Sequence, residues 1–323
     1  MNAIAQWRPT ATLAALKARA ASLRVTRDFF RARNVLEVET PALVNAPVSD
    51  VNLGSVCAAV PGRAAPMFLH TSPEYAMKRL LAAGSGDIYQ VCRVYRGAER
   101  GRQHNPEFTM VEWYRLGFSL ESLMDEVAAL VRELLGADAL PVEFLTYREA
   151  VRRHAGVDPL DAERAQLAEL ARTLGLGARE AQSAGRDELL DLIVGAQVGP
   201  ALGAAALTFV HRYPASQAAL ARLDPADPRV ALRFELYYRG VELANGYHEL
   251  ASGAEQRLRF AADLEVRAAR GLPSAALDQN LLAALDAGLP DCAGVALGFD
   301  RVLMLATSAA SIDDVLAFPV ERA

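Results

Sequence analysis

The chain has 323 residues, of which 52% are hydrophobic and 23% charged, and its formal net charge is −5. These values are typical of a globular protein in water, and the length suits one large domain or one domain with an insertion. The acidic balance speaks weakly against a dedicated nucleic-acid binder, although it leaves room for a local basic groove. Three cysteines without C-x-x-C spacing predict neither a disulfide framework nor a zinc site.

The N-terminal stretch and the hydropathy of the chain bear on its cellular location. The N-terminal stretch lacks the basic start and unbroken apolar core of a secretory signal, and no run approaches the roughly 18 apolar residues of a membrane span. We therefore expect a cytoplasmic protein that does not enter a membrane.

Helices and strands alternate irregularly in the first 136 residues. Apolar residues at helical spacing predict a long amphipathic helix over 11–34, with Asn34 as its stop. A strand follows at 35–40, which Pro41 ends or confines to a sheet edge. Further along, the composition predicts helices over 73–84 and 119–136 and strands over 88–96 and 108–115.

The second half contains a helical insertion and then a strand-rich region. Residues 146–205 are rich in Ala and Leu with little strand signal, and predict helices. Strand patterns return at 207–213 and 229–250, a helix is expected over 255–270 followed by a linker broken by proline, and a short strand and helix close the chain at 294–306. This order predicts an α+β fold on an antiparallel sheet rather than βα repeats.

Asn245-Gly246, flanked by β-type residues, is a strong hairpin signal. A two-residue turn there would place Glu242 opposite Glu249, and two facing carboxylates repel unless a cation lies between them. Mg²⁺ suits such a pair because it takes one or two carboxylates and completes its shell with phosphate and water oxygens. The alternative is a solvated hairpin end with both carboxylates in water.

Glu112 lies on the same predicted strand face as Phe108, Met110 and Tyr114, because side chains alternate along a strand. A buried carboxylate among apolar residues requires a cationic partner. That partner is either a neighbouring arginine or the ammonium group of a ligand, with the Tyr114 hydroxyl as a second contact.

Several arginines accompany this acidic position. Arg96 ends one strand and leads into a loop with Glu99, Arg100 and Arg102, and guanidinium groups match phosphate oxygens. Arg301 falls in the first turn of the last helix after Gly298, where a helix N-terminus also favours anions. A surface arginine run is usually only solvated, and a glycine-bracketed strand is common in cores.

Together these features supply arginines for a polyphosphate, carboxylates for Mg²⁺ and an acidic pocket for an amine. No Ser-His-Asp or Cys-His arrangement is evident in the sequence, which argues against covalent catalysis. Attack on a phosphorus atom of ATP requires positioning and charge stabilisation but no protein nucleophile, and fits this set best.

At these residues the chain resembles the class II aminoacyl-tRNA synthetases of the lysyl type. "VLEVETPAL" is similar to motif 1, "YRGAERGRQHNPEFTMVEWYR" to motif 2 and "GVALGFDR" to motif 3, while "TSPE" and "ELANGYHEL" resemble lysyl-branch signatures. The resemblance covers the whole chain as a single catalytic domain over 1–323, without the anticodon-binding module of those synthetases. "YPASQAAL" and Ala296 resemble a stand-alone paralogous group that attaches (R)-β-lysine to a lysine of translation elongation factor P.

The resemblance implies a role for each matching residue. ATP and Mg²⁺ are the expected cofactors, motif 1 implies a homodimer, elongation factor P is the expected partner, and tRNA is disfavoured. The implied ATP contacts are Arg96, Gly97, Ala98, Glu99, His104, Asn105, Phe108, Glu242, Leu243, Gly298 and Arg301, with Glu242 and Glu249 on Mg²⁺. The implied substrate contacts are Ser72, Pro73, Glu74, Glu112, Tyr114, Asn245, Glu249 and Ala296, and Arg96, Arg301, Glu242 and Glu249 are the implied catalytic residues.

One position departs from the family pattern. Motif 2 usually reads Arg-x-Glu, but position 98 is alanine and the glutamate follows at Glu99. Either the loop shifts to bring Glu99 to the adenine, which we favour, or backbone and stacking alone hold the base. Two alternatives to the ligase remain: a synthetase-like enzyme acting on tRNA or a small molecule, and an inactive regulatory paralogue.

Overall fold

The computed structural model describes residues 7–97 and 99–323, so Ala98 lies outside the described residues. The chain divides into two compact units. The first comprises the described parts of Met1–Ser119, Ala129–Asp138 and Leu250–Ala323, and the second comprises Leu120–Ala128 and Ala139–Glu249. Helix α3 (Leu120–Leu135) contributes to both.

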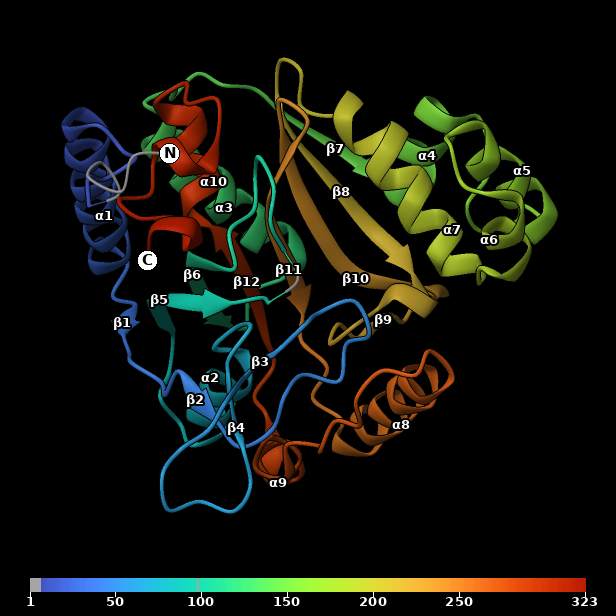
Figure 1. Cartoon of the computed structure of the whole chain (residues 1–323), viewed down its shortest axis with the longest axis horizontal. Helices are drawn as coiled ribbons and strands as arrows, with labels where there is room; N and C mark the ends of the chain where they lie inside the picture. The colour runs from blue at the N-terminus through green and yellow to red at the C-terminus, as the bar shows by residue number, and fades with distance from the viewer. Residues whose placement is uncertain (1–6, 98) are drawn as a thin grey trace. The chain divides into compact units, whose positions relative to one another are not determined.

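The first unit is built on a sheet with the strand order β1-β5-β6-β12 (Figure 1). β5 (Ile88–Tyr95), β6 (Glu107–Leu116) and β12 (Cys292–Gly298) are antiparallel, as predicted, and β1 (Leu36–Glu37) runs parallel to β5. β1 is much shorter than the expected strand over 35–40 and lies at one end of this order. A small second sheet pairs β2 (Leu43–Val44), β4 (Met67–Leu69) and β3 (Val56–Ala58).

Helices pack on both faces of this sheet. On one face, Phe30 of α1 (Leu13–Ala32) stacks on Tyr89 with ring centroids 4.3 Å apart and meets the edge of Trp113. On the other, Ile88 and Tyr114 pack in an apolar cluster with α2 (Glu74–Ala82), α8 (Gly253–Ala269) and α9 (Gln279–Gly288). α9 corrects the expected linker after the 255–270 helix, because Asp278 caps a run of leucines that the sequence reading missed.

The predicted helix signals agree with the structure. Thr12 caps α1, and Asn34 follows the helix at φ 55° as its stop. The Ser72 hydroxyl accepts a hydrogen bond from the Glu74 backbone N–H at the start of α2, and Gly84 follows that helix at φ 87°. α10 (Phe299–Ala306) begins directly after Gly298, its N-cap.

The second unit contains the rest of the strands and a group of helices. Its sheet has the order β11-β10-β8-β7, with β9 (Leu223–Asp224) paired to β10. β8 (Leu207–Pro214), β10 (Asp227–Tyr238) and β11 (Val241–His248) are antiparallel, and β7 (Val142–Thr146) is parallel to β8. Figure 1 shows the helices of residues 147–201 as one cluster, formed by α4 (Tyr147–Ala155), α5 (Arg164–Thr173), α6 (Ala178–Ser183), α7 (Arg186–Ile193), a π turn (Val194–Val198) and a 3-10 turn (Gly199–Ala201).

The largest difference from the sequence prediction is the position of the β10–β11 turn. The turn lies at Arg239-Gly240, where both residues have positive φ values of 50° and 71°, as a tight hairpin turn requires. Asn245 and Gly246 instead lie inside β11, paired with Glu235 and Phe234. The strand ladder therefore overrides the local Asn-Gly signal, and the prediction that Glu242 faces Glu249 across a hairpin is wrong.

An ion pair with a buried carboxylate connects α1 to α10, and hydrogen bonds connect both partners to β6. Asp300 is 1% exposed, accepts a hydrogen bond from the Thr109 backbone N–H at 2.6 Å, and pairs with the Arg19 guanidinium. Arg19 also donates to the Thr109 hydroxyl at 3.2 Å. Asp300 thereby fixes the strand next to Phe108 and the helix turn that carries Arg301.

Replacing Asp300 with alanine is expected to lower the free energy of unfolding by about 3–5 kcal/mol, because a largely buried guanidinium and a buried backbone N–H lose their acceptor. Urea denaturation followed by circular dichroism measures this. Asp28→Ala is the control, because its pair with Arg31 is exposed and should contribute less than about 1 kcal/mol. Equal losses in the two variants would contradict a structural role for the buried pair.

Candidate active site

The loop between β5 and β6 holds the arginine that was predicted to bind phosphate. Arg96 follows β5, its guanidinium lies 5.2 Å from the centroid of the Phe108 ring, and its Nη1 is 3.6 Å from the Glu99 carboxylate. Gly97 donates its N–H to the Gly54 carbonyl at 2.8 Å, and a Cβ there would lie 3.3 Å from Val56. The loop thus turns Glu99 back toward Arg96.

His104 and Arg301 meet at the far end of the same loop. Arg301 donates from Nη2 to His104 Nε2 at 2.7 Å and from Nε to the Gln103 carbonyl at 3.3 Å. Burial, followed by the Arg301 charge, lowers the pKa of His104 below its ordinary value, so the ring is neutral at pH 7 and its Nε2 accepts. Glu99 raises this pKa and Arg96 lowers it, so both side chains lie close enough to act on the ring.

The C-terminal segment holds this loop in place. Arg100 forms paired hydrogen bonds with Asp313, at 2.8 and 3.1 Å, and also pairs with Glu321. The Arg102 carbonyl accepts the Ile312 N–H at 2.9 Å, and Asn105 Oδ1 accepts the Val320 N–H at 3.1 Å. These contacts, which join residues about 200 positions apart, could not be read from the sequence.

Arg100→Ala is expected to raise the Michaelis constant for ATP about three- to tenfold, because the loop loses four charged hydrogen bonds to the C-terminal segment while Arg96 and Arg301 remain. The Michaelis constant for the amino acid should stay within twofold. Steady-state pyrophosphate exchange measures both. Arg172→Ala, which removes an exposed ion pair on α5, serves as control and should change neither constant.

Glu112 is buried on the face of β6 that also carries Tyr114, as the alternation of side chains along the strand predicted. It is 2% exposed, its Oε1 accepts from the Tyr114 hydroxyl and its Oε2 from the Ser72 hydroxyl, both at 2.7 Å. The strand register pairs Glu112 with Ala296 of β12. Both hydroxyls are neutral donors, so they orient the carboxylate without neutralising its charge.

Pro73 and Glu74 lie at the start of α2. Pro73 is the N-cap residue and is buried. Glu74 Oε1 accepts from Lys78 Nζ at 2.8 Å, and Lys78 is 1% exposed. The carboxylate of Glu74 is therefore engaged by a buried ammonium, a partner that the sequence reading did not anticipate.

In the second unit, β11 presents its polar residues on one face because of a β-bulge. Tyr237 pairs with Glu242, whereas Leu236 pairs with Ala244, so Leu243 is the extra residue. An extra residue shifts the alternation of side chains by one. Glu242 therefore shares its face with Asn245, although the two residues lie three positions apart in the strand.

This face carries a row of largely half-buried polar residues, of which the sequence reading had named only Glu242 and Asn245. Arg233 donates to Asn245 Oδ1 at 3.2 Å and pairs with Glu235, and Asn245 donates to the Tyr247 hydroxyl at 3.1 Å. Burial, then the charges of Glu235 and Glu242, raise the pKa of the Tyr237 phenol well above its ordinary value. The only sign of this row in the sequence is the alternation of polar residues at 233, 235 and 237 with apolar residues between them.

Glu249 lies just beyond β11, where it bridges to Ala221, and it is 4% exposed. With the bulge, regular alternation from Asn245 assigns Glu249 to the face of Glu242. Among the described residues, no group of three or more His, Cys, Asp or Glu side chains is arranged to hold a metal ion. Two carboxylates still fit Mg²⁺, since this ion takes the rest of its shell from substrate phosphates and water.

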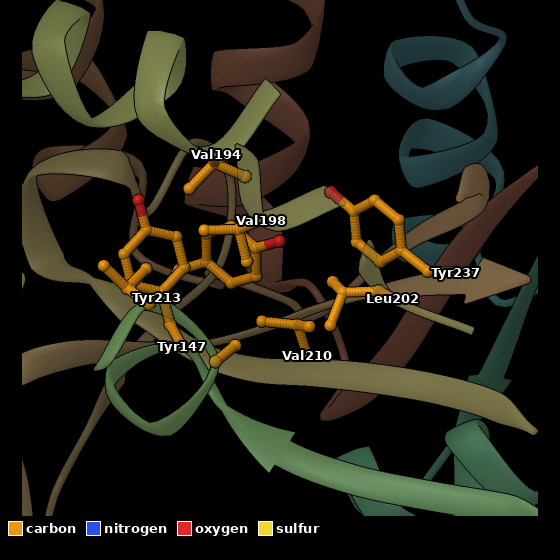
Figure 2. Close-up of a pocket in the computed structure, with 9 residues that line it drawn as sticks. Tyr147, Val194, Val198, Leu202, Val210, Tyr213 and Tyr237 are labelled. Carbon is orange, nitrogen blue, oxygen red and sulfur yellow. The ribbon is translucent and has the colours of Figure 1, made fainter. Parts of the chain in front are cut away.

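The helical cluster of the second unit contains a cavity-like region that we exclude as a ligand site. Figure 2 shows it lined by three tyrosines, Tyr147, Tyr213 and Tyr237, and by aliphatic side chains such as Val198. The empty volume between these side chains is about 180 Å³, but it is divided into gaps that are too small to hold a water molecule. It is close-packed core.

In the part of the chain that the structure describes, no helix combines the length and apolarity needed to cross a bilayer.

The chain is similar to one family of known proteins and, along its whole length, to several individual proteins. The family model of the class II tRNA synthetases (D, K and N) matches residues 2–322. The elongation factor P–(R)-β-lysine ligase of Klebsiella pneumoniae is 50% identical over 327 aligned positions, covering 100% of both chains. The protein of the same name from Vibrio cholerae is 51% identical over 98% of both chains, and that of Salmonella paratyphi B is 50% identical over 100% of both.

Proposed function

Because the chain belongs to the class II tRNA synthetases of the D, K and N group, we propose that it is an ATP-dependent ligase for (R)-β-lysine, or lysine, and elongation factor P. Relatives that match it at about 50% identity along its whole length carry that name. The single catalytic domain over 1–323, with its helical insertion at 146–205, is part of this proposal, as is a cytoplasmic location, where translation factors reside.

The reaction has two steps. A carboxylate oxygen of the amino acid attacks the α-phosphorus of ATP, the bond to the β-phosphate oxygen breaks, and pyrophosphate leaves with an aminoacyl-adenylate formed. The ε-amine of a lysine on the protein acceptor then attacks the acyl carbon, AMP leaves, and an amide forms with loss of one proton. Neither step requires a nucleophile from the enzyme.

The observation that carries the proposal is the combination of two features of the first unit. One is a buried carboxylate that hydroxyl groups orient, and the other is two arginines, Arg96 and Arg301, that both act on the neutral His104. A buried carboxylate suits the ammonium end of a diamino acid. We assign this contact to Glu112 and Tyr114, with Ser72, Pro73, Glu74 and Ala296 shaping the pocket and Asn245 and Glu249 as further substrate contacts.

The arginines provide the charge that the first step requires. We assign Arg96 to the α-phosphate and Arg301 to the γ-phosphate, with Phe108 stacked on adenine, because guanidinium groups stabilise charge on a transferring phosphoryl group. Gly97, Ala98, Glu99, His104, Asn105, Leu243 and Gly298 complete the proposed nucleotide contacts. Glu242 and Glu249 would hold Mg²⁺, which supplies positive charge to the phosphates when bound.

A homodimer through the motif 1 segment is also part of the proposal. Leu13 of α1 and Leu36 of β1 are 68% and 55% exposed, so a dimer through these elements would bury both side chains. Sedimentation equilibrium should give twice the chain mass.

The test of the proposed function combines the purified protein, ATP, Mg²⁺, (R)-β-lysine and unmodified elongation factor P. Mass spectrometry should show the acceptor heavier by one β-lysyl group, attached at a lysine. An acceptor of unchanged mass, together with charging of total tRNA, would favour the tRNA enzyme instead. Absence of amino-acid-dependent pyrophosphate exchange would favour the inactive regulator.

A further inference from the structure

Gln90 is a buried polar residue next to the acidic pocket that no sequence motif indicated. It lies on β5, is 3% exposed, and its Cα pairs with that of Glu112 on β6. Residues that pair across antiparallel strands present their side chains to the same face. Glu112 therefore lies between Gln90 on one neighbouring strand and Ala296 on the other.

The amide oxygen of Gln90 accepts no hydrogen bond from the described parts of the chain. Its Oε1 is buried and has no hydrogen-bond partner among the residues that the structure describes. A buried oxygen of this kind is costly to leave unpaired, so native proteins rarely keep one without a ligand or water. The amide N–H group of Gln90 faces Cys92. Burial, followed by the charge of Glu112, raises the pKa of the Cys92 thiol to about 12, and the hydrogen bond with Gln90 acts in the opposite direction.

This face of the sheet thus combines a buried carboxyl group and a buried amide oxygen on neighbouring strands. An ammonium group has three N–H donors and no acceptor. The Glu112 carboxylate already accepts hydrogen bonds from two hydroxyl groups, so it cannot accept from all three ammonium donors as well. A hydroxyl group has one donor and also offers lone pairs, so it would leave the Gln90 oxygen unpaired.

We propose that Gln90 is a specificity-determining residue whose Oε1 accepts a hydrogen bond from the terminal ammonium of the diamino-acid substrate beside Glu112. This inference rests on the proposed function. It extends the recognition of the amine from one strand to two, and it makes the pocket selective for a primary ammonium over a hydroxyl of the same chain length.

Gln90→Met tests the proposal, because methionine keeps the length of the side chain and removes only the amide. The Michaelis constant for the diamino acid in pyrophosphate exchange should rise about tenfold, and that for ATP should stay within twofold. The melting temperature of the ligand-free protein should be unchanged or higher, since an unpaired buried oxygen is removed. A merely structural glutamine would instead give a lower melting temperature and similar changes in both constants.

Two comparisons complete the experiment. Gln197→Met removes another amide with an unpaired buried Oε1, whose N–H donates to the His154 carbonyl within the helical cluster, and should leave the amino-acid constant unchanged. The analogue of lysine with a hydroxyl in place of the terminal amine should be rejected less strongly by Gln90→Met than by the wild type.

The failures can be told apart. A wild-type protein that activates the diamino acid, combined with a Gln90→Met variant of unchanged amino-acid constant, overturns the role of Gln90 alone. A wild-type protein without any amino-acid-dependent exchange overturns both this role and the proposed function.

Discussion

Replacing Glu112 with glutamine is expected to raise the Michaelis constant for the amino acid about 10- to 150-fold, because the substrate ammonium loses a charged partner worth about 1.5–3 kcal/mol. The constant for ATP should change less than threefold. The amide is isosteric with the carboxylate, and the Ser72 and Tyr114 hydroxyls can reorient toward it, so the fold should persist.

Glu107→Gln on the same strand is the matched control for this measurement. Glu107 is exposed and lies 3.5 Å from Arg93, so its charge faces solvent and should matter little to either substrate. Steady-state pyrophosphate exchange with each substrate varied in turn gives both constants. If Glu112→Gln weakened the use of ATP as much as the use of the amino acid, the carboxylate could not be the recognition group for the amine.

Arg301→Lys is expected to lower kcat/KM for ATP about 100- to 1,000-fold, the typical loss when one preorganised donor to a transition state is removed. Lysine retains the charge but not the planar fork that reaches His104 and the Gln103 carbonyl and that, in the proposed reaction, also binds a phosphate. The melting temperature should change little, because the side chain is only partly buried.

The control for this variant is Arg322→Lys, which changes an exposed arginine of the C-terminal segment. Single-turnover formation of the adenylate, followed by quenched-flow, separates the chemical step from product release. An Arg301→Lys enzyme as active as the wild type would show that position 301 needs only a positive charge, or none.

Local sequence patterns predicted many of the helices and strands because, at those segments, the intrinsic preference of the residues and the packing of the fold favour the same structure. The Thr12 cap, the Asn34 stop and the β5–β6 pair with Glu112 and Tyr114 on one face follow from rules that involve a few neighbouring residues. The resemblance of three motifs to one family then fixed the class of fold, which the family model confirms.

The errors have a common physical cause. Asn245-Gly246 has strong turn propensity, but both residues pair with Glu235 and Phe234 of β10, and Phe234 and Glu235 are buried. The Arg100 contacts with Asp313 and Glu321 and the pairing of Gln90 with Glu112 depend on segments far apart in the chain. Periodicity within a window cannot report such neighbours.

The extra residue at Leu243 has a consequence for how this segment tolerates change. Side chains of a strand point to opposite sides in turn, so excising one residue there would swing Asn245, Tyr247 and Glu249 to the reverse side of the sheet as a single block. Chain length at this point is accordingly under tighter constraint than residue identity. If β11 were one residue shorter here, Asn245 would lose its contacts with Arg233 and Tyr247 even though no residue type had changed.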